Sequence, residues 1–124
     1  MLIEGPSGAG KSDLALRLID RGAVLVSDDR TAVMQDDRKL IARAPSRMAG
    51  RIEVRGVGIV SVPHVASAPV ALIIRLGAEA VRLPEPRTRR IAGMAIREVV
   101  VDPFRASAPL KVEWALRDAD MERA

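Results

Sequence analysis

Residues 5–12 read Gly5-Pro6-Ser7-Gly8-Ala9-Gly10-Lys11-Ser12. They follow a short apolar stretch, residues 2–4, which predicts the end of a buried strand, and they precede residues 13–20, whose apolar side chains have helical spacing. A glycine, any four residues and then Gly-Lys-Ser is the phosphate-binding loop pattern between a strand and a helix. Glycine lets several backbone N–H groups reach one phosphate, and the N-terminus of the helix favours an anion. This stretch therefore predicts an α/β fold with a phosphate site.

The residues around this loop suggest a nucleoside triphosphate with Mg²⁺. Lys11 would add a positive charge for the β- and γ-phosphates, and the Ser12 hydroxyl would be offered to Mg²⁺. Asp28 and Asp29 follow residues 23–26, an apolar run that predicts a second buried strand. One carboxylate would hold Mg²⁺ or its water, and the other would accept a proton from an attacking hydroxyl. The alternative is a solvated turn capped by aspartate.

The rest of the chain shows more strand than helix. We expect a hairpin from residues 31–34 and 40–43 around a polar turn, and a bent strand over residues 51–62. Further strands are expected at residues 70–76 and 95–101, with a loop at 84–90. Residues 108–119 favour a final helix capped by Ser107, although alternating apolar residues leave a strand open. Trp114 is expected in the core, and the sheet is expected to be mixed, with few helices.

Composition excludes several classes of protein. The 124 residues predict one domain over 1–124, and 48% apolar with 29% charged residues are unlike a disordered or membrane-spanning chain. The absence of cysteine excludes a disulfide scaffold, a cysteine-ligated zinc and a cysteine nucleophile. No signal peptide is visible, so we expect a cytoplasmic location. The net charge of +4 suits phosphates or an acidic protein; Phe104 and Trp114 are the only aromatic residues, so nucleic-acid binding is disfavoured.

Isolated charged residues are weaker signals. By itself, Glu53 in its arginine-flanked strand favours a paired surface carboxylate over a metal ligand. His64 is expected to be structural or exposed. The candidate arginines for gripping a partner are Arg82, Arg87, Arg89 and Arg90, and for the last three a solvated loop is favoured.

Three blocks together resemble the catalytic domain of the HPr kinase/phosphorylase family, in the short form without an N-terminal domain. The first block is residues 5–22, the second is Val26-Ser27-Asp28-Asp29-Arg30, and the third is Ile52-Glu53-Val54-Arg55-Gly56-Val57-Gly58-Ile59. The third block is similar to the family's signature around its metal-binding glutamate and is the most diagnostic. The blocks cover about half the chain.

The resemblance implies an activity and the residues for it. Family members transfer the γ-phosphoryl group of ATP to a serine of HPr, the phosphocarrier protein of the sugar phosphotransferase system, and reverse the step by phosphorolysis to pyrophosphate. The fold is similar to the nucleotide-binding core of phosphoenolpyruvate carboxykinase, and the assembly is commonly a homohexamer. By position, Lys11 binds phosphate, Ser12 and Glu53 bind Mg²⁺, Asp29 is the acid/base with Asp28 as companion, and Arg82 is the catalytic arginine.

The chain departs from the family in two places. Full members carry a catalytic histidine on a strand upstream of the loop. The sequence begins at Met1, just before residues 2–3, so we expect that strand and its histidine to be missing, and His64 does not replace the histidine by position. Where longer members have Gly-Arg-Asn, residues 102–107 differ, which weakens the phosphorylase half of the expectation. A nucleotide-sensing module with little transfer activity, or a kinase of another substrate, are the alternatives.

Overall fold

The computed structural model describes residues 1–28, 30–45 and 49–123. Its elements, in chain order, are β1 (Leu2–Glu4), α1 (Lys11–Asp20), β2 (Ala32–Asp36), β3 (Lys39–Arg43), β4 (Arg51–Val54), β5 (Gly58–Ser61), β6 (Ser67–Pro69), β7 (Leu72–Leu76), β8 (Arg87–Ile91), β9 (Met94–Val101) and α2 (Ala108–Arg123). This is the expected mixed α/β architecture with few helices.

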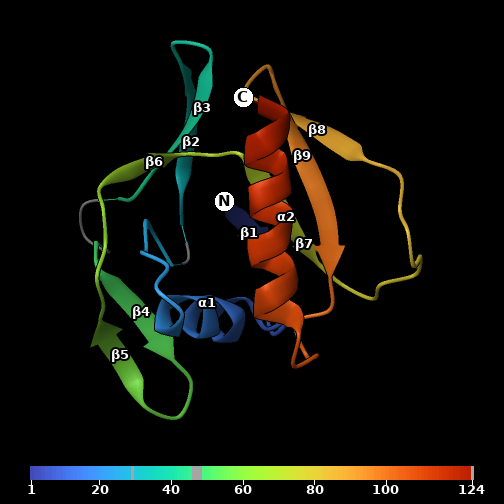
Figure 1. The fold of residues 1–124 in the computed structure, drawn as a ribbon. Coiled ribbons are helices and arrows are strands. Elements are labelled where there is room, and N and C mark those ends of the chain that lie inside the picture. Colours follow the sequence, from blue (N-terminus) through green and yellow to red (C-terminus); the bar gives the residue numbers. More distant parts are fainter. Residues whose placement is uncertain (29, 46–48, 124) are drawn as a thin grey trace.

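The central sheet has the strand order β1-β7-β9-β8. β1, β7 and β9 run parallel, and β8 pairs antiparallel with β9 at the edge. α2 covers one face of this sheet, and α1 lies across one end of the molecule (Figure 1). Leu72, Ile73, Ile74 and Leu76 of β7 are all buried, as expected for a central strand covered on both faces.

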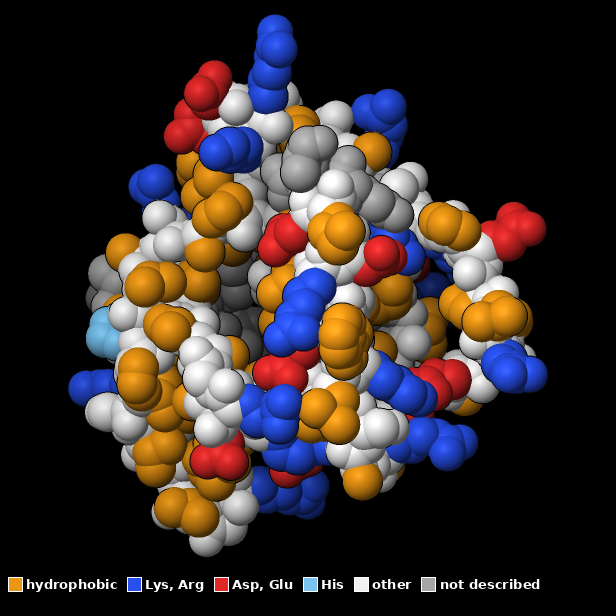
Figure 2. Space-filling model, viewed as in Figure 1, with side chains coloured by type: hydrophobic (Ala, Val, Ile, Leu, Met, Phe, Trp, Pro, Cys, Tyr) orange, Lys and Arg blue, Asp and Glu red, His pale blue; other side chains and the backbone are white. Residues whose placement is uncertain are grey.

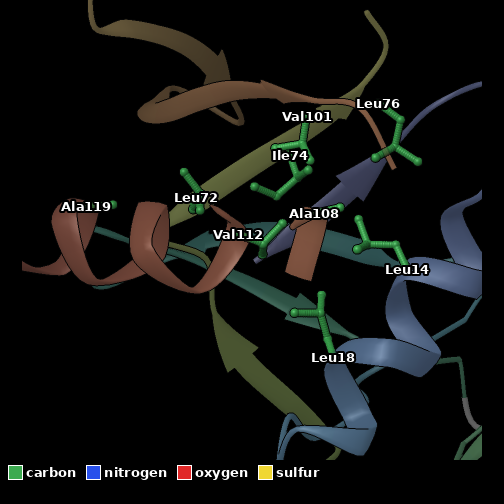
Figure 3. Packing of buried hydrophobic residues seen from close by; sticks show 9 residues of the cluster. All are labelled: Leu14, Leu18, Leu72, Ile74, Leu76, Val101, Ala108, Val112 and Ala119. Atoms are coloured by element: carbon green, nitrogen blue, oxygen red, sulfur yellow. The ribbon is translucent and has the colours of Figure 1, made fainter. Parts of the chain in front are cut away.

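Alternation along β7 divides the core into two clusters. Leu72, Ile74 and Leu76 lie on the face of β7 that α1 and α2 cover, and they share the first cluster with residues that include Leu14 and Val112 (Figure 3). The second cluster contains Ile73 of β7 and Ile96 of β9 together with Leu40 and Ala42 of β3 and with Val70. The β2–β3–β6 sheet therefore packs through its buried side chains against the opposite face of the central sheet.

Two hairpins flank the central sheet. β2 and β3 pair antiparallel around Asp37 and Arg38, whose φ angles of 48° and 62° are both positive, as a two-residue primed turn requires. The expected hairpin is confirmed, and its turn is formed by Asp37 and Arg38. Residues 51–62 form a second hairpin, β4–β5, in place of one bent strand. Gly56, with φ 86°, supplies the turn between them.

The expected strand at residues 23–26 is wrong. Only Leu25 makes a bridge, to His64: the Leu25 N–H donates to the Pro63 carbonyl at 3.1 Å and the Val65 N–H donates to the Leu25 carbonyl at 2.9 Å. Pro63 has no N–H to extend this ladder, and Val24 is 51% exposed. His64 itself is exposed, as expected, and its ring lies against Gly50.

Two further expectations need correction. The expected loop at residues 84–90 ends early, because Arg87–Ile91 is strand β8. Trp114 lies outside the core: it is 65% exposed on α2, and the guanidinium carbon of Arg117 stands 4.7 Å from its ring centroid. The helix expected from residue 108 is confirmed and continues to Arg123. Within the described ranges, neither helix combines the length and apolar character needed to cross a membrane.

Truncation of a buried side chain should lower the free energy of unfolding more than truncation of an exposed one. Ile74→Ala removes a fully buried side chain, so we expect a loss of about 2–5 kcal/mol in the free energy of unfolding. Trp114→Ala removes only a surface cation–π contact, so we expect a loss of about 1 kcal/mol or less. Urea denaturation of both variants measures the difference. A loss for Trp114→Ala as large as that for Ile74→Ala would contradict the exposed position of the ring.

Candidate functional site

The segment between β1 and α1 is shaped by its glycines. Gly8 and Gly10 have φ angles of 80° and 97°, values that a side chain would strain. A Cβ at Gly5 would lie 3.2 Å from the Cβ atoms of Ala9 and Leu76, which is too close for easy accommodation. The Ala9 N–H donates to the Pro6 carbonyl at 3.0 Å and closes the turn. The loop therefore takes a compact form that other residues could not adopt freely.

The loop leads directly into α1. Gly10 is the N-cap residue and has no side chain to satisfy the first N–H groups of the helix, and these groups have no partner within a helix. The Lys11 Nζ atom donates to the Gly5 carbonyl at 2.7 Å. The lysine thus crosses the loop and places its charge beside the backbone amides, an arrangement that suits a bound anion.

Asp28 joins two elements that lie far apart in the sequence. The Ser12 hydroxyl donates to Asp28 Oδ1 at 3.1 Å, and the Glu53 backbone N–H donates to Asp28 Oδ2 at 2.9 Å. One half-buried carboxylate thus holds the first turn of α1 against β4. The structure brings Ser12, Asp28 and the backbone of Glu53 together and leaves the side chain of Glu53 exposed.

A cavity of about 480 Å³ opens beside the loop, a volume within the usual range of small-molecule sites. Gly5, Lys11 and Asp28 are among the residues that line it, and much of the remaining lining is apolar and comes from β1, α1 and segment 23–26. In the space-filling view the molecule is hollowed between α2 and the β2–β3–β6 side (Figure 2).

Among the predicted site residues that the structure describes, Arg82 is not joined to this group. Arg82 lies in the exposed segment between β7 and β8, which extends away on the β8 side (Figure 1). Among the described residues, no hydrogen bond or ion pair joins it to the loop or to Asp28. Asp29 lies outside the described residues.

The loop that follows β9 is joined to α1 by Arg17, a residue of the last turn of this helix. The Arg17 guanidinium on α1 donates to the Pro103 carbonyl and, at 3.3 Å, to the Arg105 carbonyl. Glu79 holds the start of this loop from the other side: it accepts the Asp102 N–H at 3.0 Å and the Lys111 ammonium at 2.7 Å. The hydrogen bond from Lys111, followed by that from Asp102, holds the pKa of Glu79 below its ordinary value.

Arg89 has a structural role that was not predicted from the sequence. On β8 it donates to Glu4 Oε1 at 2.8 Å and stands 3.2 Å from Glu98 Oε2, so it ties the edge strand to the last residue of β1, just before the glycine loop. Its hydrogen bond lowers the pKa of the Glu4 carboxyl. Arg87 and Arg89 are two residues apart, and side chains at this spacing lie on the same face of a strand. This spacing could have indicated strand β8 in the sequence.

Fold and loop geometry together define a mixed α/β protein with a glycine-rich loop at the N-terminus of its first helix. The model of the HPr serine kinase C-terminal domain family matches residues 1–76, and the chain belongs to that family. The likeness extends further in three dimensions. A solved structure of the Hpr(Ser) kinase/phosphatase from Coxiella burnetii is 31% identical, with a TM-score of 0.82 over 98% of this chain and 87% of that chain.

Curated relatives match over a shorter stretch. The HPr kinase/phosphorylase of Clostridium acetobutylicum is 46% identical over 63 residues, which is 51% of this chain and 21% of that protein. The HPr kinase/phosphorylase of Clostridium perfringens is 52% identical over 62 residues, covering 50% of this chain and 20% of that protein. The chain thus matches about a fifth of the length of these relatives.

The Glu79 contacts predict a stability that depends on pH. A lowered folded-state pKa stabilises the protein above the ordinary glutamate pKa of about 4.3, and this contribution disappears as the pH falls through the lowered value. Glu79→Gln should therefore lower the melting temperature at pH 7, and the difference from the unaltered chain should shrink near pH 3. Thermal unfolding at both pH values measures this, with the exposed Glu85→Gln as control. A deficit of the same size at both pH values would contradict the ionic role.

Proposed function

We propose that the chain is the catalytic part of an ATP- and Mg²⁺-dependent HPr serine kinase/phosphorylase, which phosphorylates a serine of the phosphocarrier protein HPr. Family membership supports this class of activity. The observation that carries the proposal is the Asp28 carboxylate, which accepts hydrogen bonds from the Ser12 hydroxyl and the Glu53 N–H beside the glycine loop.

The residues at this position fit Mg²⁺. Ser12, Asp28 and Glu53 offer a hydroxyl and two carboxylates, the hard oxygen ligands that this ion takes alongside substrate phosphates. We assign Ser12 and Glu53 as its protein ligands, and the exposure of the Glu53 carboxylate supports this assignment. When bound, the ion would neutralise negative charge on the phosphates.

In the kinase direction, the glycine loop and Lys11 bind and orient the phosphates of ATP. Asp29 takes the proton of the serine hydroxyl while the serine oxygen attacks the γ-phosphorus. The bond from that phosphorus to the bridging oxygen breaks, and ADP leaves. Asp28 keeps the end of α1 and β4 in position, and Arg82 stabilises the charge on the transferring phosphoryl group.

In the reverse direction, an oxygen of inorganic phosphate attacks the phosphorus of the phosphoserine. The bond from phosphorus to the serine oxygen breaks, Asp29 returns a proton to that oxygen, and pyrophosphate is released. The similar Coxiella burnetii protein is a kinase/phosphatase by name, which supports a role in both addition and removal of the phosphate.

The family resemblance supports further parts of the proposal. We infer a nucleotide-binding core similar to that of phosphoenolpyruvate carboxykinase, a single catalytic domain over residues 1–124, and a homohexameric assembly in the cytoplasm. HPr is the protein partner, and ATP, phosphate and pyrophosphate are the small ligands.

Transfer to HPr tests the proposal directly. Incubation of the chain with Mg²⁺, ATP and HPr should yield phosphoserine on HPr, detected by mass spectrometry. Lys11→Ala should abolish ATP binding, because it removes the charge beside the loop, whereas Lys39→Ala, in the exposed β2–β3 turn region, should leave it unchanged. Asp29→Asn should keep ATP binding and lose transfer, because the amide cannot accept the proton.

Two results would reject different parts of the proposed function. ATP binding without phosphoserine on HPr would reject the kinase and favour a nucleotide-sensing module. Normal transfer by Asp29→Asn would reject Asp29 as the base.

A further inference from the structure

An exposed aromatic ring stands beside the glycine loop. Phe104, the single phenylalanine of the chain, is 79% exposed. A Cβ added at Gly10 would lie 3.7 Å from Phe104 Cε1 and 3.4 Å from two side-chain carbons of Pro103. The edge of the ring therefore borders the residue at which the glycine loop meets α1.

The backbone around this ring is fixed on both sides. The Phe104 N–H donates to Asp102 Oδ1 at 3.0 Å, and Arg17 donates to the carbonyls of Pro103 and Arg105, the residues before and after it. The Ala108 N–H donates to the Arg105 carbonyl at 3.1 Å and connects the loop to α2. Phe104 is thus presented to solvent by a well-braced segment. Exposed ring surface of this kind gains free energy when another flat apolar group covers it.

We infer that Phe104 forms a nucleobase subsite: it stacks on the base of the nucleotide whose phosphates lie in the Gly5–Ser12 loop. This inference rests on the proposed function, since it requires a nucleoside triphosphate in the loop. The loop holds the phosphates through its backbone, so the ribose and base must extend past one of its borders. Phe104 forms the border at Gly10, and Arg105 beside it adds a cation to the same segment.

Stacking on Phe104 determines which ligands the subsite can distinguish. Every base offers a flat π-face, so an aromatic platform binds bases with little discrimination between them. A ligand without a base, such as pyrophosphate, gains nothing from the ring. The subsite should therefore distinguish nucleotides from inorganic phosphates and discriminate only weakly between ATP and GTP.

Titration calorimetry with Mg²⁺ and two probes, ATP and pyrophosphate, tests this. Phe104→Ala should weaken ATP binding by about 5- to 150-fold, the range expected for one stacked base, and leave pyrophosphate binding unchanged. Phe104→Tyr keeps the ring and should keep the ATP affinity. Met121→Ala, which removes another exposed apolar side chain (77% exposed) from α2, is the matched control and should change neither.

The other outcomes overturn the inference in distinguishable ways. Unchanged ATP affinity in Phe104→Ala, with reduced transfer to HPr, would assign the ring to the protein partner instead. Equal weakening for ATP and pyrophosphate would mean that Phe104 only shapes the loop. Failure of the unaltered chain to bind ATP would reject the proposed function together with the subsite, whereas unchanged ATP affinity in the variant rejects the subsite alone.

Discussion

The parallel pairing of β1 and β9 with the central strand β7 is the constraint on which the site depends. Parallel strands end at the same edge of a sheet, so the segments that follow them meet there. The glycine loop after β1, Glu79 after β7 and the 102–105 loop after β9 are brought together in this way. β7 can occupy the centre because four of its five side chains are apolar and can be buried on both faces. This burial fixes its register against both neighbours.

A second constraint comes from Asp28, which lies outside that sheet. Its two oxygens accept one bond from a side chain, Ser12, and one from a backbone N–H, that of Glu53. Bonding through the backbone fixes the position of β4 without using the Glu53 carboxylate. A charged acceptor makes stronger hydrogen bonds than a neutral one. The hairpin that carries Glu53 is therefore held at the N-terminus of α1 by an interaction that leaves the glutamate side chain available to a ligand.

Local chemistry was sufficient to predict the parts of this site that depend on nearby residues. The glycine loop, α1 and the β2–β3 hairpin follow from glycine spacing, helical periodicity and a polar turn. The remaining elements depend on contacts between segments that are separated along the chain. Residues 23–26 are as apolar as a strand, but Pro63 opposite them cannot extend a ladder. Arg87–Ile91 resembles a solvated loop until Glu4, which is distant in sequence, and Glu98 of the neighbouring strand β9 neutralise Arg89.

The exposed position of Trp114 was also not predicted from the sequence. Its size favours the core, but α2 presents Ala108, Val112 and Ala119 to the sheet, and these smaller residues allow close packing. The periodicity of the helix then places residue 114 elsewhere, where Arg117 covers part of its ring. A single large apolar residue is thus a weaker guide to the buried face than the helical spacing of its smaller neighbours.

In the proposed function, one part of the site recognises phosphate and another part distinguishes ligands. Backbone N–H groups at the N-terminus of a helix bind any suitably placed phosphate, whatever else the ligand carries. Selection must come from side chains around them, and the segments after β7 and β9 supply several of these. Both segments follow residue 76, where the match to the family model ends, although the structural likeness covers 98% of the chain. The fold is thus shared beyond residue 76, so the segments after β7 and β9 add their side chains to the loop on a scaffold common to this chain and the Coxiella burnetii protein.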